Sequence, residues 1–195
     1  IQGDNRWEVA AESAAQAESS DETPTSGPAT TSPVDRQETQ GRIAPTYQLL
    51  RLPGAEQEDF VLLRPFTPRD RPQLSAFLTA TPDGRLVSFN VPSGRSPNGP
   101  GVAADRMQNE DDIGELRTFF EREGTDVTFG NVLLVPIEES LLYVRSVYVT
   151  ATADQPQVRA VIVYWQDGTD SDRVAVGNTL SEALEELFGI HLETL

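Results

Sequence analysis

The stretch VLLVPIEESLLYVRSVYVT, residues 132–150, decides the fold because it reads as two strands joined by a short turn. Residues 132–137 and 141–150 are rich in β-branched and aromatic side chains, which favour strands. Glu138 and Glu139 lie at the tip between the two strands. The stretch therefore predicts a hairpin of two antiparallel strands.

Further segments with the composition of strands lie on both sides of this hairpin, separated by proline, glycine and acidic turns. They comprise residues 47–52, 60–64, 74–79, 85–91, 126–129, 158–165 and 173–176. Pro65 and Pro68 are expected to end the strand at 60–64, because proline cannot donate to a strand ladder. Most connections are short, so the sheet is expected to be mainly antiparallel.

Two segments predict helices. In residues 110–123 the apolar side chains fall on one face, and acidic residues begin the segment. Residues 180–188 begin with the capping box of Thr179 and Glu182 and end at Gly189. The sequence therefore predicts an α+β fold, a mainly antiparallel sheet of hairpins with these two helices packed on one face.

The chain divides unevenly along its length. Residues 1–9 contain Trp7 and Val9 and are expected to return to the fold as a short strand. Residues 10–44 are acidic and rich in Ala, Ser, Thr and Pro, which predicts a disordered loop inserted at the edge of the domain. Residues 45–190 then form the α+β domain, and residues 191–195 form a tail.

Composition excludes several classes of function. The 195 residues carry a net charge of −16, which repels nucleic acid and anionic lipid surfaces. All 15 basic residues are arginine, which fits either a GC-rich genome or a salty habitat. There is no cysteine, so disulfides and zinc–thiolate sites are excluded. We expect no cofactor. Since the chain starts at Ile1 without a targeting signal, we expect a fragment of a longer protein.

The chain has few of the side chains that catalysis commonly uses. His191 is the only histidine, and without cysteine or lysine the usual nucleophile designs are unavailable. Glu138 and Glu139 are the best carboxylate pair by position, although a solvated hairpin tip explains them as well. Glu110 and the acidic residues after it suit the start of a helix. We therefore predict that the domain is not an enzyme.

Two other segments were weighed as ligand sites. Asp167, Asp170 and Asp172 are calcium candidates, because calcium favours several oxygen ligands, or they form an ordinary charged turn. The loop Pro92–Gly101 is rich in glycine but has no lysine and no phosphate-binding pattern. We interpret this loop as structural.

The segment from Arg64 to Arg69, RPFTPR, is the candidate partner-binding strip. Arg64, Phe66, Arg69 and Arg71 combine arginine and aromatic side chains, which interfaces favour, on a backbone stiffened by proline. The alternative is an ordinary strand exit, with Phe66 in the core and the arginines paired within their own chain.

Several motifs together resemble the uncharacterised protein family 0182. They are LPG at 52–54, LRPFTPR at 63–69, GNVLLVPIEESLLYV at 130–144, TLSEALEELFG at 179–189 and, upstream, NRWEV at 5–9. The resemblance implies the C-terminal, extracytoplasmic part of a large bacterial protein with several N-terminal membrane helices. It supplies no catalytic residues.

Two functions follow as expectations. The first is a non-enzymatic interaction or structural module, which packs against the rest of its own membrane protein or against an envelope protein. Membrane attachment would then come only through upstream segments absent from this sequence. The alternative is a domain that binds or hydrolyses cell-envelope carbohydrate or lipid through carboxylates. Tyr164 and Trp165 are candidate stacking residues for such a ligand, although packing in the core is the favoured interpretation of both.

Overall fold

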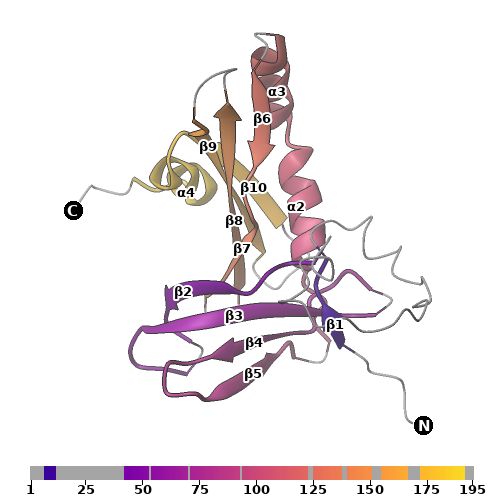
Figure 1. Cartoon of the computed structure of the whole chain (residues 1–195), viewed down its shortest axis with the longest axis vertical. Helices are drawn as coiled ribbons and strands as arrows, with labels where there is room; N and C mark the ends of the chain where they lie inside the picture. The colour runs from indigo at the N-terminus through magenta and orange to yellow at the C-terminus, as the bar shows by residue number, and fades with distance from the viewer. Residues whose placement is uncertain are drawn as a thin grey trace, which may run out of the picture.

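A computed structural model describes the protein at residues 7–11, 42–52, 54–69, 71–92, 94–122, 125–137, 140–150, 155–166 and 172–191. Within these ranges the chain forms strands β1 to β10 and helices α2, α3 and α4 (Figure 1). The expected tail beyond His191 and most of the expected loop at 10–44 lie outside them.

The first sheet is built around the long strand β3. It contains β1 (Trp7–Val9), β2 (Thr46–Leu50), β3 (Asp59–Pro68), β4 (Ala76–Ala80) and β5 (Leu86–Asn90). The order is β1-β3-β4-β5, with β2 also paired to β3, and every pairing is antiparallel. Because β4 occupies one edge of β3, the short strands β1 and β2 share the other.

The second sheet contains the hairpin from which the sequence analysis began. It consists of β6 (Asp126–Phe129), β7 (Leu133–Ile137), β8 (Ser140–Thr150), β9 (Gln157–Gln166) and β10 (Asp172–Gly177). The order is β10-β9-β8-β6, with β7 also paired to β8, and these pairings are antiparallel too. The predicted α+β class with mainly antiparallel strands is confirmed.

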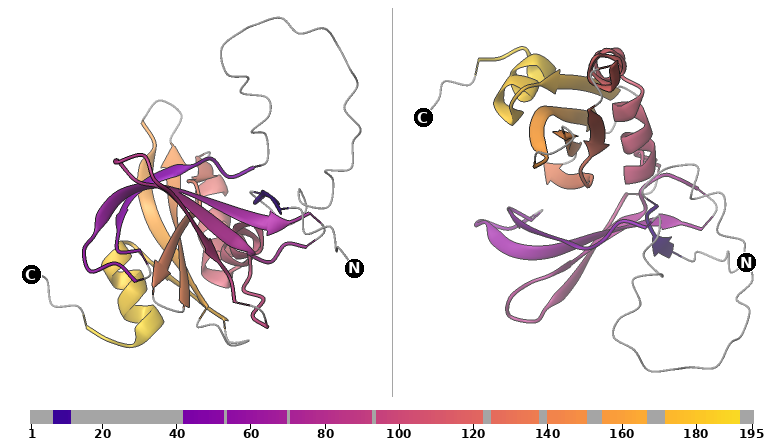
Figure 2. Two further views of the ribbon diagram at one scale, coloured as in Figure 1. Left: turned by 90° about the horizontal axis from the view of Figure 1, so that it is seen from below. Right: turned by 45° about the horizontal axis from the view of Figure 1, so that its top comes forward.

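The main core lies between the two sheets and is closed at one side by α2 (Pro100–Gln108) and α3 (Asp111–Arg122) (Figure 2). Its fully buried side chains include Val61 and Leu63 of β3, Tyr143 of β8, Tyr164 of β9 and Met107 of α2. Helix α4 (Leu180–Phe188) packs on the opposite face of the second sheet, where Ala183 and Leu187 form a smaller cluster with that sheet.

The arrangement differs from the expectation in three respects. The strands form two sheets instead of one, and the helices α3 and α4 cover opposite faces of the second sheet instead of one face. The third difference is α2, which begins inside the segment interpreted as a loop. Pro100 opens this helix, where its fixed φ is favourable and its missing N–H is not needed.

Strand β3 continues through Pro65, which was expected to end it. The carbonyl of Pro65 accepts a hydrogen bond from the amide of Ala10 at 3.2 Å, so this residue directs its backbone polar groups away from β4. On the edge of β3 away from β4, neither β1 nor β2 pairs with Pro65. The absent N–H therefore costs no ladder bond, and Pro65 stays in register with Phe77 of β4.

The ends of the expected loop at 10–44 belong to the folded part. Ala11 and Arg42 form an isolated antiparallel bridge, and the amide of Ile43 donates to the carbonyl of Ala10 at 2.9 Å. Ala10 and Ile43 are both buried, and Arg42 lies 3.5 Å from the carboxylate of Glu8. Residues 11 and 42 are therefore held side by side.

Helix α4 begins and ends as the sequence predicted. The amide of Glu182 donates to the Thr179 hydroxyl at 3.2 Å, and the Glu182 carboxylate accepts from the amide of Asn178 at 2.9 Å. Gly189 ends the helix in the left-handed conformation at φ 65°. Among the described helices, none is long and apolar enough to cross a membrane.

Candidate functional site

The candidate site is the face of the first sheet that is turned away from the second sheet. Paired residues of an antiparallel sheet share a face, so the strand register identifies its members. We call this surface the outer face; it consists of Trp7, Val9, Tyr47, Leu49, Phe60, Leu62, Arg64, Phe66, Pro68, Ala76, Leu78, Ala80, Leu86, Ser88 and Asn90. Figure 2, right, shows the described helices grouped on the other side of the sheet.

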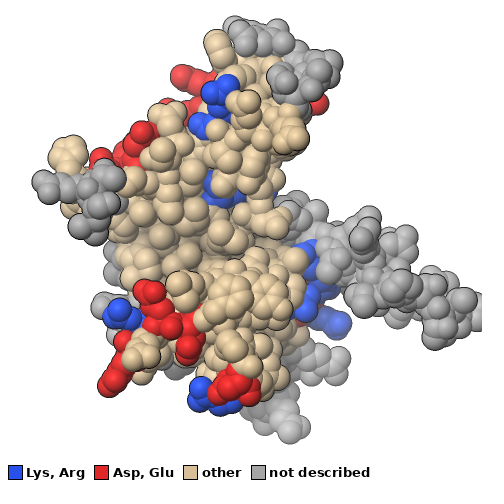
Figure 3. Space-filling model, turned by 60° about the vertical axis from the view of Figure 1, so that its left-hand side comes forward, with Lys and Arg blue, Asp and Glu red and all other residues tan. Residues whose placement is uncertain are grey.

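The outer face is apolar and largely open to solvent. Leu86 is 70% exposed, Tyr47 69%, Leu49 65% and Phe60 54%. The rings of Tyr47 and Phe60 stack at 5.5 Å, which fixes a flat aromatic platform across β2 and β3. The lower part of Figure 3 shows an uncharged surface with charged side chains along its margins. Large contiguous apolar surfaces are often interaction sites, which makes this face the candidate site.

Among the described strand residues of the outer face, Arg64 is the only one with a charged side chain. It lies on β3 between Leu62 and Phe66 and opposite Leu78 of β4. Its Nε is buried and has no hydrogen-bond partner among the described residues. A buried donor without an acceptor costs about 1–3 kcal/mol, so Arg64 is an energetic exception within this face.

The structure separates the four residues predicted to bind a partner. Arg64 and Phe66 are half-buried on the outer face, and Phe66 belongs to neither core cluster. Arg69 and Arg71 are exposed beyond the end of β3. Phe66 therefore is not the core residue of the alternative interpretation, while a role of the four residues in binding stays a prediction.

Most of the outer face was not predicted from the sequence, including Tyr47, Leu49, Phe60 and Leu86. A signal for it was present in FVLL at 60–63, where apolar residues occupy both faces of the strand instead of alternating with polar ones. Strands of this composition are typical of sheets covered on both faces. The structure shows described elements covering only one of the two.

A second cluster of polar groups lies inside the molecule and joins the loop before α2 to the second sheet. The Tyr143 hydroxyl donates to the carbonyl of Asn98 at 2.7 Å, and the Asn98 amide donates to the side chain of Gln166 at 2.7 Å. The Asn98 side chain also donates to the Tyr164 hydroxyl at 2.6 Å. Asp172 accepts from Tyr164 at 3.1 Å, so each hydroxyl has a partner.

Burial raises the pKa of both tyrosines in this cluster. Desolvation raises the pKa of Tyr143, and the neighbouring Tyr164 adds to that shift. Burial likewise raises the pKa of Tyr164 to about 12, even though the hydrogen bond from Asn98 lowers it. Both hydroxyls stay protonated at neutral pH. Tyr164 is fully buried in this cluster, which agrees with core packing and not with the alternative use as a stacking residue for a ligand.

The other candidates are dispersed over the molecule. Trp165 packs edge-on against Phe188 of α4, with 5.2 Å between ring centroids. His191 is exposed, 3.5 Å from the carboxylate of Glu185. The calcium candidate Asp172 has Arg106 Nε 3.7 Å from its carboxylate. Glu138, Glu139, Asp167 and Asp170 lie outside the described residues.

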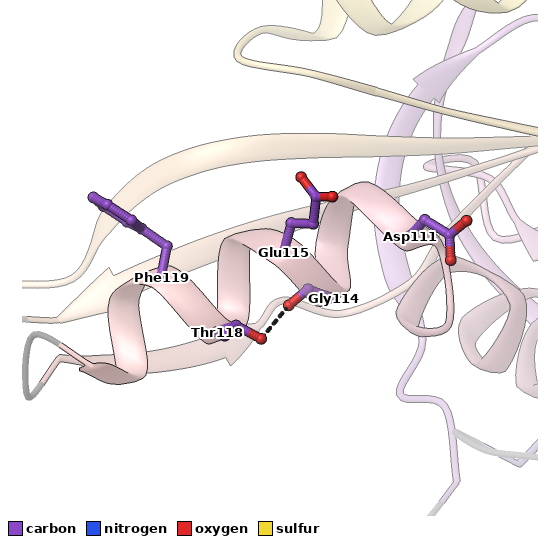
Figure 4. A pocket seen from close by; sticks show the side chains of 5 residues that line it. All are labelled: Asp111, Gly114, Glu115, Thr118 and Phe119. Carbon is purple, nitrogen blue, oxygen red and sulfur yellow. Dashed lines mark hydrogen bonds between the residues drawn. The ribbon is translucent and has the colours of Figure 1, made fainter.

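Carboxylates also line a shallow depression of about 490 Å³ on α3 (Figure 4). Asp111, Gly114, Glu115, Thr118 and Phe119 line it, and all five belong to one helix. Just before this helix, desolvation raises the pKa of Glu110, and the charges of Asp111, Asp112 and Glu186 raise it further. These acidic groups repel one another at a helix start, where acidic residues were expected.

The fold and the site thus define an α+β protein of two antiparallel sheets with one open apolar face. The chain belongs to the Uncharacterised protein family (UPF0182), whose model matches residues 1–120. That range contains the whole first sheet and α2.

Relatives extend the match beyond this range. A UPF0182 protein of Methanospirillum hungatei is 34% identical over 157 residues, which cover 77% of this chain and 17% of the relative. One of Geotalea uraniireducens is 36% identical over 153 residues, 75% of this chain and 17% of the relative. The chain thus spans about a sixth of the length of these relatives. No solved structure matches the chain.

Proposed function

We propose that this chain is a structural docking domain within a longer protein, and that its outer face packs against another part of that protein. The observation that carries the proposal is the exposure of Tyr47, Leu49, Phe60 and Leu86 on one continuous sheet face. Covering such a face removes apolar area from water, which stabilises the covered state by about 25 cal/mol for each Å² buried.

The length of the relatives supports an occupant from the same polypeptide. The aligned region is 17% of the relative from Methanospirillum hungatei and 15% of a relative from Microcystis aeruginosa, so most of a family protein lies elsewhere in its chain. The extracytoplasmic setting and the membrane-bound parent implied by the family resemblance remain part of this proposal. An envelope protein is the alternative occupant.

The proposal gives the domain no catalytic role. The alternative, an enzyme or binding domain for envelope carbohydrate or lipid, needs a concave pocket with convergent polar groups. Asp111 and Glu115 line the depression on α3 from a single helix, and this geometry gives the alternative no specific support.

The test places a charge on the outer face in two contexts. Leu86→Glu is expected to leave the stability of the 195-residue chain within about 0.5 kcal/mol, since Leu86 is 70% exposed. In the full-length gene product the same change should bury an unpaired charge and increase cleavage by a protease added at low concentration. Phe119→Glu is the matched control, because Phe119 is 58% exposed on α3, away from the outer face.

Equal cleavage of the full-length Leu86→Glu and Phe119→Glu proteins would count against the outer face as a packing surface. A loss of stability in the isolated chain would instead show that Leu86 supports the domain itself.

A further inference from the structure

Arg64 restricts the chemistry of the segment that covers the outer face. The described strand residues of the face offer no carboxylate to this guanidinium, although the whole chain has 31 acidic residues against 15 basic ones. Its Nε is already buried without an acceptor among the described residues. Covering the face removes the remaining water from the guanidinium, and a buried charge needs both a counter-charge and hydrogen-bond partners.

We propose that the segment of the longer protein that covers the outer face is apolar and carries one carboxylate, which binds Arg64. This inference rests on the proposed function and specifies the partner of that site. A carboxylate satisfies a guanidinium with two parallel hydrogen bonds, and it supplies the missing charge at the same time. A backbone carbonyl would satisfy Nε but leave the charge uncompensated.

The same reasoning argues against a second copy of this chain as the occupant. In a twofold interface the same patch meets itself, so the outer face would cover an identical outer face. Two copies of Arg64 would then be buried with no carboxylate from the strand positions of either face. An occupant from another region of the long family protein carries no such penalty.

The location of Arg64 makes the pair a determinant of register. Arg64 lies on β3, a central strand of the sheet. It stands between Leu62 and Phe66 along the strand and opposite Leu78 of β4. The surrounding apolar contacts are non-directional, whereas a bidentate ion pair fixes position and orientation. The carboxylate therefore selects one placement of the covering segment.

The first step of the test identifies the occupant. A photo-crosslinking amino acid replaces Tyr47, which is 69% exposed on the outer face, in the full-length gene product, and mass spectrometry locates the attached peptide. The control carries the crosslinker at Val158 of β9, which is 50% exposed on the second sheet. We expect position 47 to capture an apolar segment of the same polypeptide with an Asp or Glu close to the crosslinked residue.

The second step tests the ion pair by charge exchange. Arg64→Glu should reduce the crosslink from position 47 by about tenfold or more, because it opposes two like charges in a desolvated contact. Exchanging the captured carboxylate for arginine should restore the crosslink in this background. Arg159→Glu, at an exposed position on β9, should leave the yield unchanged.

The possible outcomes separate the two proposals. If no intramolecular crosslink forms from position 47, the proposed function itself fails. Capture of a second, isotope-labelled copy would show that the outer face binds another copy of the protein and not a segment of the same polypeptide. A crosslink that survives Arg64→Glu, or one whose segment has no carboxylate, keeps the docking surface and overturns the ion pair. In the 195-residue chain, Arg64→Met should be neutral or stabilising. A clear loss of stability there would assign Arg64 to the domain's own fold.

Discussion

Removing one hydroxyl from the interior should measure how firmly the loop before α2 is attached to the second sheet. In Tyr143→Phe the ring of this fully buried residue stays in place, and the carbonyl of Asn98 loses the donor that lies 2.7 Å away. The lost hydrogen bond contributes about 1 kcal/mol, and the desolvated carbonyl raises the expected cost to about 1–2 kcal/mol. For a protein of this size the Tm should fall by roughly 2–8 °C.

The assay is urea unfolding of the 195-residue chain followed by circular dichroism. The midpoint should move while the slope m stays constant, because the surface exposed on unfolding does not change. Tyr148→Phe is the control, since this half-buried tyrosine makes no hydroxyl hydrogen bond with the described residues. A loss below about 0.5 kcal/mol for Tyr143→Phe, or a loss equal to that of the control, would refute the role assigned to this contact.

Changes of pH and of single residues test other parts of the fold. Stability should fall as pH rises from 10 toward 12, because burial raises the pKa of Tyr164 from 10.0 to about 12 and the unfolded chain releases its proton first. Tyr143→Phe should flatten this alkaline decline, measured by thermal unfolding at each pH. Gly177→Ala should cost about 1–3 kcal/mol in urea unfolding, because its Cβ would overlap the backbone nitrogen of Ala183 in α4. By contrast, Gly114→Ala in the open space along α3 should stabilise by about 0.5–1 kcal/mol. Thr179→Ala should cost about 1 kcal/mol by the same assay, because it removes the N-cap of α4.

Local signals explain which elements were predictable. The strands of the second sheet and α4 follow from runs of β-branched residues and from the Thr179–Glu182 capping box, both of which act over short distances. Helix α2 lacks such signals: Gly101 and Val102 are poor helix formers, and its buried face is made of small residues such as Ala103 and Ala104. It is held by tertiary packing.

Nonlocal pairing accounts for the rest. The division into two sheets depends on which strands meet, and no local pattern encodes that choice. Of the outer face, only Arg64 and Phe66 were predicted as binding residues, because their neighbours Tyr47, Leu49 and Leu86 join them only when the strands pair. Arg64 became informative through its buried Nε, which the sequence does not show.

The bridge between Ala11 and Arg42 has a practical consequence for the study of this domain. Because the fold itself holds these two residues together, a flexible linker placed between them would add a loop-closure cost of only about 0.6 kcal/mol for each doubling of its length. These two positions therefore suit the insertion of a glycine–serine linker, an affinity tag or a small fluorescent domain. Such an insertion would report on the longer protein without touching either sheet.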